Sequence, residues 1–509
     1  MHFDTQAQVT PTLGFNILVI CLGSFLFGYH LSELNAPQRI ISCRLHQEGP
    51  MSWWAQHPEL FEQCIPMKSS QRAMITTMLS FGGLLGSLYS GWVATKIGRK
   101  KISILVSLGY VLSSVLLTIA NSYGMLNLGR FIAGLSSGAC LAVTPMLIFE
   151  ITPVVHRGFM GTMMQLSICC GITTSQVMGY YYANDTQWRN IFLFNVLISL
   201  TYTLLLPFTM ESPKWLITVK KDVKRATALL KKVRGTHKEV EGEVYHWRGL
   251  SVNQRHSKTY GSVTDTNASE FNSLPAIEEE LAPSKSRRYS VDINVDNITV
   301  WQLLTIPRFH KDVIAIIGLM LSIQLTGQNS ITFYGVDVLS GIFPQNTSLI
   351  NIFLSVINIF ITLVSSLLID KTGRKPMLLM SDFLMIVGSF VLALSMRNDW
   401  NWAVVISVAV FVIGFSTGIS SVPYLMIPEM LEHDVIPAAQ ALGATVNWTT
   451  GIIISYFFPI VNERLPTGEV YFIFTFICIM FFIFVVRRVP ETKGKVNYNE
   501  VWKDYHFYT

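Results

Sequence analysis

Apolar stretches of roughly 20 residues alternate with short polar connections along almost the whole chain. Because a helix needs about 20 apolar residues to cross the hydrocarbon core of a bilayer, each stretch predicts one transmembrane helix. No small-residue cleavage site follows the first stretch, so we interpret it as a retained helix and not as a signal peptide. The pattern predicts an all-α membrane protein with twelve transmembrane helices, at residues 13–34, 72–94, 102–120, 125–149, 159–181, 190–210, 312–335, 348–369, 377–396, 402–427, 438–461 and 469–486.

A long polar segment separates the first six expected helices from the last six. Within it, residues 217–235 are basic and helix-prone, whereas residues 250–295 have the composition of disordered chains. Arg287-Arg288-Tyr289-Ser290 resembles a basophilic-kinase site, which makes Ser290 a candidate for phosphorylation; a solvated basic run is an equal alternative. The predicted organisation is an N-terminal tail (1–12), a six-helix bundle (13–210), the central loop (211–307), a second six-helix bundle (308–487) and a C-terminal tail (488–509).

Short motifs recur in the two halves at a nearly constant offset. Lys96-Ile-Gly-Arg-Lys100 and Lys371-Thr-Gly-Arg-Lys375 lie 275 residues apart, and Glu211-Ser-Pro and Glu491-Thr-Lys lie 280 apart. The pairs Pro145…Glu150 and Pro423…Glu429 repeat at almost the same distance. Three echoes at one offset indicate that the halves are copies, a plan that carriers use to place a site between the copies.

Composition and charge agree with a membrane protein. Half of the residues are hydrophobic and only 14% are charged, against about 25% in soluble domains. Lys and Arg gather in 96–101, 371–375 and 487–495, whereas the connections on the other side carry few, so these clusters and both termini are expected in the cytosol. The net charge of +6 then reflects topology and not nucleic-acid binding. A plasma membrane and a vacuolar membrane both fit.

The seven cysteines do not form a disulfide framework. Cys43 and Cys64 share the first non-cytosolic connection, where a disulfide can form, and the other five lie in apolar helices as small packing residues. No Cys/His cluster has metal-ligand spacing, and no nucleophile–base set or phosphate loop is present, so neither a metal, nor a cofactor, nor enzyme activity is expected. Glycosylation sequons occur at Asn184 and Asn346 on the outer side, close to the membrane, and at Asn267 and Asn297 on the cytosolic side, where they would remain unused.

Longer motifs lie in order along the chain: Gly23-Ser-Phe-Leu-Phe-Gly-Tyr29, Asn35-Ala-Pro-Gln38, Gly129-Arg130-Phe-Ile-Ala-Gly134, Glu211-Ser-Pro-Lys-Trp-Leu216, Gln324-Leu-Thr-Gly327, Asn447-Trp-Thr449 and Pro490-Glu-Thr-Lys-Gly494. They resemble the signatures of the sugar porter family of the major facilitator superfamily, which includes the facilitative glucose transporters. The resemblance covers nearly everything except the termini and the central loop, and it implies two six-helix bundles and sugar transport. The stretch from Phe27 to Pro37 also resembles a fungal branch associated with vacuolar protein sorting.

Neutral amides inside apolar helices are the main candidates for sugar contacts. Polar side chains are costly in a bilayer and usually face a cavity or a partner helix, and an amide can both donate to and accept from a hydroxyl. Interhelical hydrogen bonding is the alternative for any single amide. Gln165, Gln324, Asn329 and Asn358 match sugar-contact positions of the family. The full candidate set is Gln165, Gln176, Gln324, Gln328, Asn329, Asn358 and Asn447, with Phe415 and Tyr424 as apolar walls.

Two positions depart from the family pattern. Ile323 replaces the first Gln of a usual Gln-Gln pair, and Ser416 stands where the glucose transporters carry Glu. A sugar hydroxyl left without a partner at a buried position costs about 1–3 kcal/mol. Hexose recognition is therefore expected to be weakened, and another polyol-like substrate is the alternative.

Charged residues at the expected cytosolic helix ends form a second group. They are Arg99, Glu150, Arg157, Asp370, Arg374 and Glu429, and they resemble the family's inner gate, in which salt bridges between the halves close the cavity to the cytosol. Simple topology charges are the alternative reading, although the two glutamates do not fit it. Ile436 occupies a position where the family has an Arg partner, which predicts a weaker gate.

His30, Glu33 and Arg130 bear on the energy source. Proton-coupled members of the family carry Asp where this chain has His30, and Glu33 lies one helical turn later on the same face. Glu33 would favour a protonated His30, whereas burial and Arg130 would oppose it, so a neutral His30 and facilitated diffusion of the sugar are favoured. A proton-coupled symporter is one alternative, and a non-transporting sugar sensor or trafficking-related protein on the same fold is another. The expected partners are a small sugar, the lipid bilayer and, in the symporter, protons.

Overall fold

The computed structural model describes residues 10–153, 156–234, 240, 244, 247, 299–340, 346–431, 435–466, 468–495 and 498–503. Ser290, Asn267 and Asn297 lie outside the described residues, as do the side chains of Arg157 and Asp370. Every regular element in the described part of the chain is helical.

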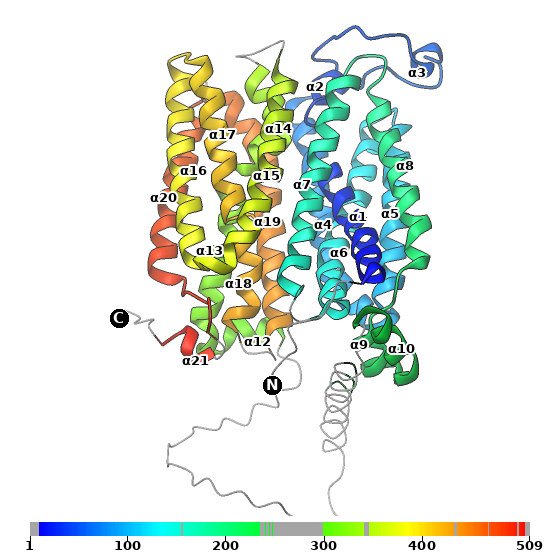
Figure 1. The fold of residues 1–509 in the computed structure, drawn as a ribbon. Coiled ribbons are helices and arrows are strands. Elements are labelled where there is room, and N and C mark those ends of the chain that lie inside the picture. The colour runs from blue at the N-terminus through cyan, green and yellow to red at the C-terminus, as the bar shows by residue number, and fades with distance from the viewer. Residues whose placement is uncertain are drawn as a thin grey trace, which may run out of the picture.

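Long helices of the N-terminal half form one bundle and those of the C-terminal half form another (Figure 1). The first half contains α1 (Pro11–Ser32), α4 (Ser69–Ile97), α5 (Arg99–Thr118), α6 (Tyr123–Ile151), α7 (Arg157–Tyr182) and α8 (Arg189–Leu205). The second contains α13 (His310–Leu325), α14 (Gln328–Ser340), α15 (Thr347–Thr372), α16 (Arg374–Arg397), α17 (Asn401–Thr417), α18 (Val422–Met430), α19 (Ile436–Arg464) and α20 (Val470–Arg488).

Short helices cover the two ends of the bundles (Figure 1). Helices α2 (Gln38–Ile41) and α3 (Trp53–Gln56) lie at the end that carries the Cys43–Cys64 connection, which we name the disulfide end. The opposite end carries the two Lys- and Arg-rich turns before α5 and α16, and we name it the basic end. It also carries α9 (Pro213–Trp215), α10 (Val223–Arg234), α12 (Val300–Thr305) and α21 (Tyr498–Val501).

Eleven helical segments of the described chain are long and apolar enough to cross a membrane. Helix α7 is the other long helix of the first bundle, and Gln165, Gln176 and several Thr, Ser and Gly residues lower its hydropathy. Two stretches expected as single helices are broken. Residues 312–335 divide into α13 and α14 at Gly327, whose φ of +94° favours glycine, and residues 402–427 divide into α17 and α18 near Gly418.

Close glycine packing sets the geometry of the first bundle. On α4, a Cβ on Gly82 or Gly86 would lie 2.2 Å from a backbone oxygen of α6. The converse holds for Gly134 and Gly138 on α6, at 2.2 and 2.0 Å from backbone oxygens of α4. Small residues four apart let two membrane helices approach closely, so larger residues here would force α4 and α6 apart.

The repeated basic motif forms the same turn in both halves. Gly98 and Gly373 have φ values of 101° and 105°, and each separates two long helices. Glu211 accepts hydrogen bonds from the backbone N–H groups that begin α5, and Glu491 does the same for α16. A carboxylate at a helix N-terminus is stabilised by the helix dipole, so the two motif echoes are parts of one capping device.

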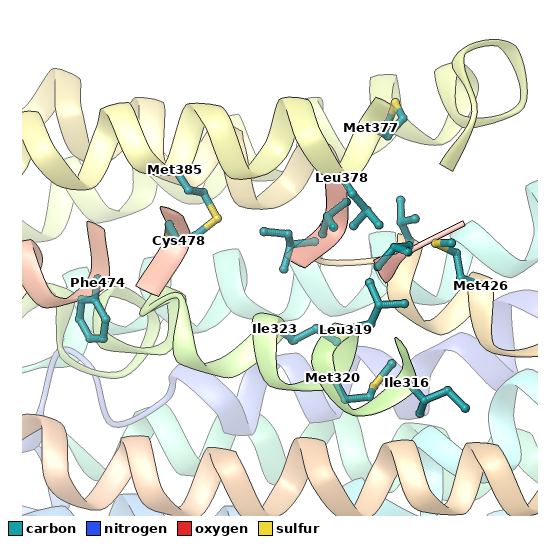
Figure 2. Close-up of a cluster of buried hydrophobic side chains, with 14 of the residues drawn as sticks. Ile316, Leu319, Met320, Ile323, Met377, Leu378, Met385, Met426, Phe474 and Cys478 are labelled. Carbon is teal, nitrogen blue, oxygen red and sulfur yellow. The ribbon is translucent and has the colours of Figure 1, made fainter. Parts of the chain in front are cut away.

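An apolar core fills the second bundle (Figure 2). Ile316, Leu319, Met320 and Ile323 of α13 belong to the same buried cluster as Met385 of α16. Ile323, which replaces an amide of the family pattern, is therefore a packing residue on α13 (Figure 2).

Candidate functional site

Three amides of the second bundle form one hydrogen-bonded group. Gln324 donates to Asn447 Oδ1 over 3.0 Å and accepts a hydrogen bond from Asn329. These residues come from α13, α19 and α14, and Gln324 and Asn447 are buried. The helix is interrupted at Gly327, and this interruption allows the Asn329 side chain to reach Gln324, five residues earlier in the sequence. The structure thus brings together three of the expected sugar ligands.

A second polar group joins the two halves near the middle of the bundles. Asn358 Oδ1 on α15 lies 2.8 Å from Ser416 Oγ, 3.2 Å from Thr362 Oγ1 and 3.5 Å from Cys169 Sγ. Cys169 belongs to α7 of the first half, and Gln165, one turn earlier, donates to its sulfur over 3.9 Å. Ser416, which replaces a Glu of the glucose transporters, thus lies within hydrogen-bonding distance of a candidate sugar ligand.

The sequence interpretation missed Cys169 and Thr362. Each lies four residues after a predicted ligand, Gln165 and Asn358 respectively, and i, i+4 residues share a helix face. That spacing could have revealed them. The sequence interpretation also missed Trp448, which packs between the halves. Its ring centroid lies 6.1 Å from that of Phe27 in an edge-on contact, and a Cβ on Gly83 would lie 2.5 Å from the Trp448 ring.

Other expected ligands take separate positions. Gln176 donates to the Ser32 hydroxyl within the first half, and Gln328 is buried with its Oε1 unpaired among the described residues. Phe415 packs against the core of the second bundle, and Tyr424 is 45% exposed. The contacts of the structure place none of these four in the two polar groups.

A buried charged network lies inside the first bundle. Glu33 Oε1 lies 2.9 Å from Arg130 Nη1 and 2.9 Å from His30 Nδ1, and all three side chains are fully buried. Arg130 also donates to the backbone oxygen of His30. The carboxylate of Glu33 is thus neutralised by Arg130, so a proton on His30 would add a second positive charge to a site with one negative charge.

Neutral groups complete the surroundings of His30. Asn195 on α8 lies 3.1 Å from His30 Nε2 and donates to Glu33 Oε2 over 3.3 Å. Ser113 and Tyr110 of α5 contact the imidazole, the latter by ring stacking at 5.4 Å. Asn195 was not among the predicted residues, although its amide inside an apolar helix is the same signal that pointed to Asn358 and Asn447.

Among the described residues at the basic end, each half contains one Arg–Glu ion pair. Arg99 binds Glu150 through two N–O contacts of 3.1 Å, and Arg374 binds Glu429 through contacts of 3.1 and 2.9 Å. The Arg374–Glu429 contact is one that we expect at the cytosolic gate, and the assignment of these residues to a gate stays a prediction. Because Arg99 and Arg374 follow equivalent glycine turns, each guanidinium is directed to the Glu of its own half.

Comparison with known proteins decides the family. The sequence profile described as "Sugar (and other) transporter" matches residues 16–502. The chain belongs to the sugar transporter family. Two yeast relatives (Saccharomyces cerevisiae) support this: a probable metabolite transport protein, 34% identical over 99% of this chain and 97% of its own, and vacuolar protein sorting-associated protein 73, 31% identical over 97% and 96%.

Solved structures confirm the fold. A partially occluded, inward-open conformation of the xylose transporter XylE from E. coli superposes with a TM-score of 0.71 and 20% identity, over 96% of this chain and 100% of that one. The predicted fold class, an all-α membrane protein with the two-bundle fold of the major facilitator superfamily, is confirmed, and so is the family resemblance.

Proposed function

We propose that this member of the sugar transporter family carries a hexose or a related sugar across a membrane by alternating access. The observation that carries the proposal is the amide group of Gln324, Asn329 and Asn447 together with the Asn358 group between the halves. Neutral amides satisfy hydroxyls that both donate and accept, without placing a charge in the membrane interior. The family membership and the fold shared with a xylose transporter support this substrate class.

Facilitated diffusion is the mode that we propose. The negative charge of Glu33 is already balanced by Arg130, which leaves His30 without a counter-charge of its own. Symport needs a group that gains a proton in one state and releases it in another. The 2.9 Å contact of His30 with Glu33 favours proton coupling as the second candidate, with His30, Glu33 and Arg130 as its site.

The charge distribution supports an orientation for the chain in the membrane. We infer that the basic end and both termini face the cytosol, because Lys and Arg concentrate there. A yeast relative with a vacuolar-sorting name supports a vacuolar membrane as an alternative to the plasma membrane, and it supports a trafficking role as the rival function.

Reconstitution of the full chain into liposomes tests these proposals together. Labelled glucose and xylose should equilibrate in a saturable manner, and a pH gradient should cause no accumulation. Gln324→Ala, which should weaken sugar binding, is the control variant. Accumulation driven by the gradient would establish the symporter instead, and sugar binding without any flux would favour the sensor.

A further inference from the structure

Apart from the Asn358 group in the middle of the bundles, the described polar contacts between the halves lie toward the disulfide end. Asn35, just after α1, accepts from the backbone N–H of Val336 over 3.0 Å and donates to the backbone oxygen of Thr332 over 3.0 Å. Deeper in the interface, Ser455 of α19 donates to Thr77 of α4 over 3.3 Å. The described ion pairs of the basic end, by contrast, lie within single halves. The structure is therefore closed at the disulfide end.

Glu463 is the charged centre of this closure. It lies in the last turn of α19, in the second half, and its Oε1 contacts side chains of the first half. Arg72 Nη2 lies 3.1 Å away, Ser69 Oγ donates over 2.7 Å, and Arg44 Nη1 lies at 3.5 Å. The Arg72 side chain is only 10% exposed, so water screens its contact less than that of Arg44, which is 40% exposed.

The Cys43–Cys64 disulfide positions Arg44 beside Glu463. Arg44 follows Cys43, which is joined to Cys64, and the backbone N–H of Ile65 donates to Ile41 over 2.7 Å. Arg44 Nη2 also donates to Ser69 Oγ over 2.7 Å, at the start of α4. The cross-linked connection is thus anchored at both of its ends beside the contact of α4 with α19, where the two bundles meet.

We propose that Glu463 is the gate residue of the disulfide end: it locks the halves together through Arg72, Ser69 and Arg44, and the Cys43–Cys64 disulfide holds Arg44 within its reach. Opening of this end separates α4 from α19 and must break all of these contacts. The lock therefore sets the population of the state that is open at the disulfide end. The inference rests on the proposed transport cycle.

Cysteine labelling in nanodiscs tests the lock with the full chain. Ser455→Cys is the reporter, because Ser455 is buried against Thr77 and we expect it to become accessible when this end opens. Glu463→Gln should raise the labelling rate with a water-soluble maleimide roughly three- to tenfold, as expected for a small network of part-exposed charges. Glu469→Gln is the control: it removes a carboxylate six positions after Glu463 in the sequence and should leave the labelling rate unchanged.

Paired substitutions separate a lock from a general loosening. The charge swap Arg72→Glu with Glu463→Arg should return labelling to the parent rate, and Arg72→Gln should add little to Glu463→Gln. Cys43→Ser with Cys64→Ser should raise labelling in the parent but not in an Arg44→Gln background. Unfolded fractions are excluded by gel filtration of each variant.

The outcomes are distinct. Parent-like labelling of Glu463→Gln, an equal rise in Glu469→Gln, or no recovery in the charge swap would overturn the lock. If the parent moves no sugar in liposomes while Glu463→Gln still accelerates labelling, the lock stands and the proposed transport function fails.

Discussion

The carboxylate of Glu33 lies 2.9 Å from the guanidinium of Arg130, and neither side chain is exposed. A buried ion pair is a weak source of net stability, but loss of one partner leaves an uncompensated charge. The pair thus makes each residue depend on the other, and His30 joins it through the 2.9 Å contact of its Nδ1 with Glu33 Oε1, so the three side chains form one buried network.

Glu33→Ala should destabilise the protein strongly, by about 3–5 kcal/mol, because Arg130 then remains buried without its counter-charge. Thermal unfolding of the detergent-purified variant measures the loss. The double variant Glu33→Ala with Arg130→Met should recover much of it, and a double variant no more stable than Glu33→Ala would show that the pair does not act as a unit.

His30→Asn should keep sugar exchange at the parent level with little dependence on pH, because in the facilitator His30 carries no proton through the cycle. Exchange of labelled sugar across liposomes from pH 5.5 to 8 measures it, an interval chosen around the range of about pH 5–8 in which His titrates. Sugar-driven alkalinisation by the parent, abolished in His30→Asn, would instead establish proton coupling.

Gln165→Ala and Gln324→Ala should each weaken sugar affinity by about 1–3 kcal/mol, roughly five- to 150-fold, because a hydroxyl of the bound sugar loses its partner. Equilibrium binding to purified protein measures this. Gln176→Ala is the control: that amide bonds Ser32 within the first half and should leave affinity unchanged. Parent-like affinity in both Gln165→Ala and Gln324→Ala would exclude these two glutamines from the sugar site.

Asp382→Leu should stabilise the protein. Asp382 on α16 is buried, and neither carboxyl oxygen has a hydrogen-bond partner in the described structure. An unsatisfied buried polar group costs about 1–3 kcal/mol, which an apolar side chain of similar size avoids. Thermal unfolding should therefore shift upward by several degrees, whereas a downward shift would reveal a partner for this carboxyl.

Glu211→Gln and Glu491→Gln should destabilise to a similar extent, by about 1.5–3 kcal/mol each, because both remove a charged acceptor from the N-terminus of a long helix. Unfolding of the two single variants measures this. Since the two caps are equivalent in the repeat, a large difference between the variants would contradict the equivalence of the two turns.

Hydropathy along the chain was enough to place the membrane helices, because the cost of exposing a polar backbone to lipid acts locally on each segment. The repeat was equally readable: Gly98 and Gly373, with Glu211 and Glu491, recur at one offset and form the same turn. The breaks at Gly327 and near Gly418 were not readable as breaks, since hydropathy does not register a change of helix direction.

Only the tertiary structure decided which hydrogen-bond partner each polar side chain has. Gln165 and Gln176 share a helix face, yet one contacts Cys169 at the interface and the other bonds Ser32 in its own bundle. Gln324 and Asn447 meet across 123 positions of sequence. Periodicity determines which face of a helix is polar, but the rotation of that helix against its neighbours, set by close packing such as that of α4 on α6, determines what the face touches.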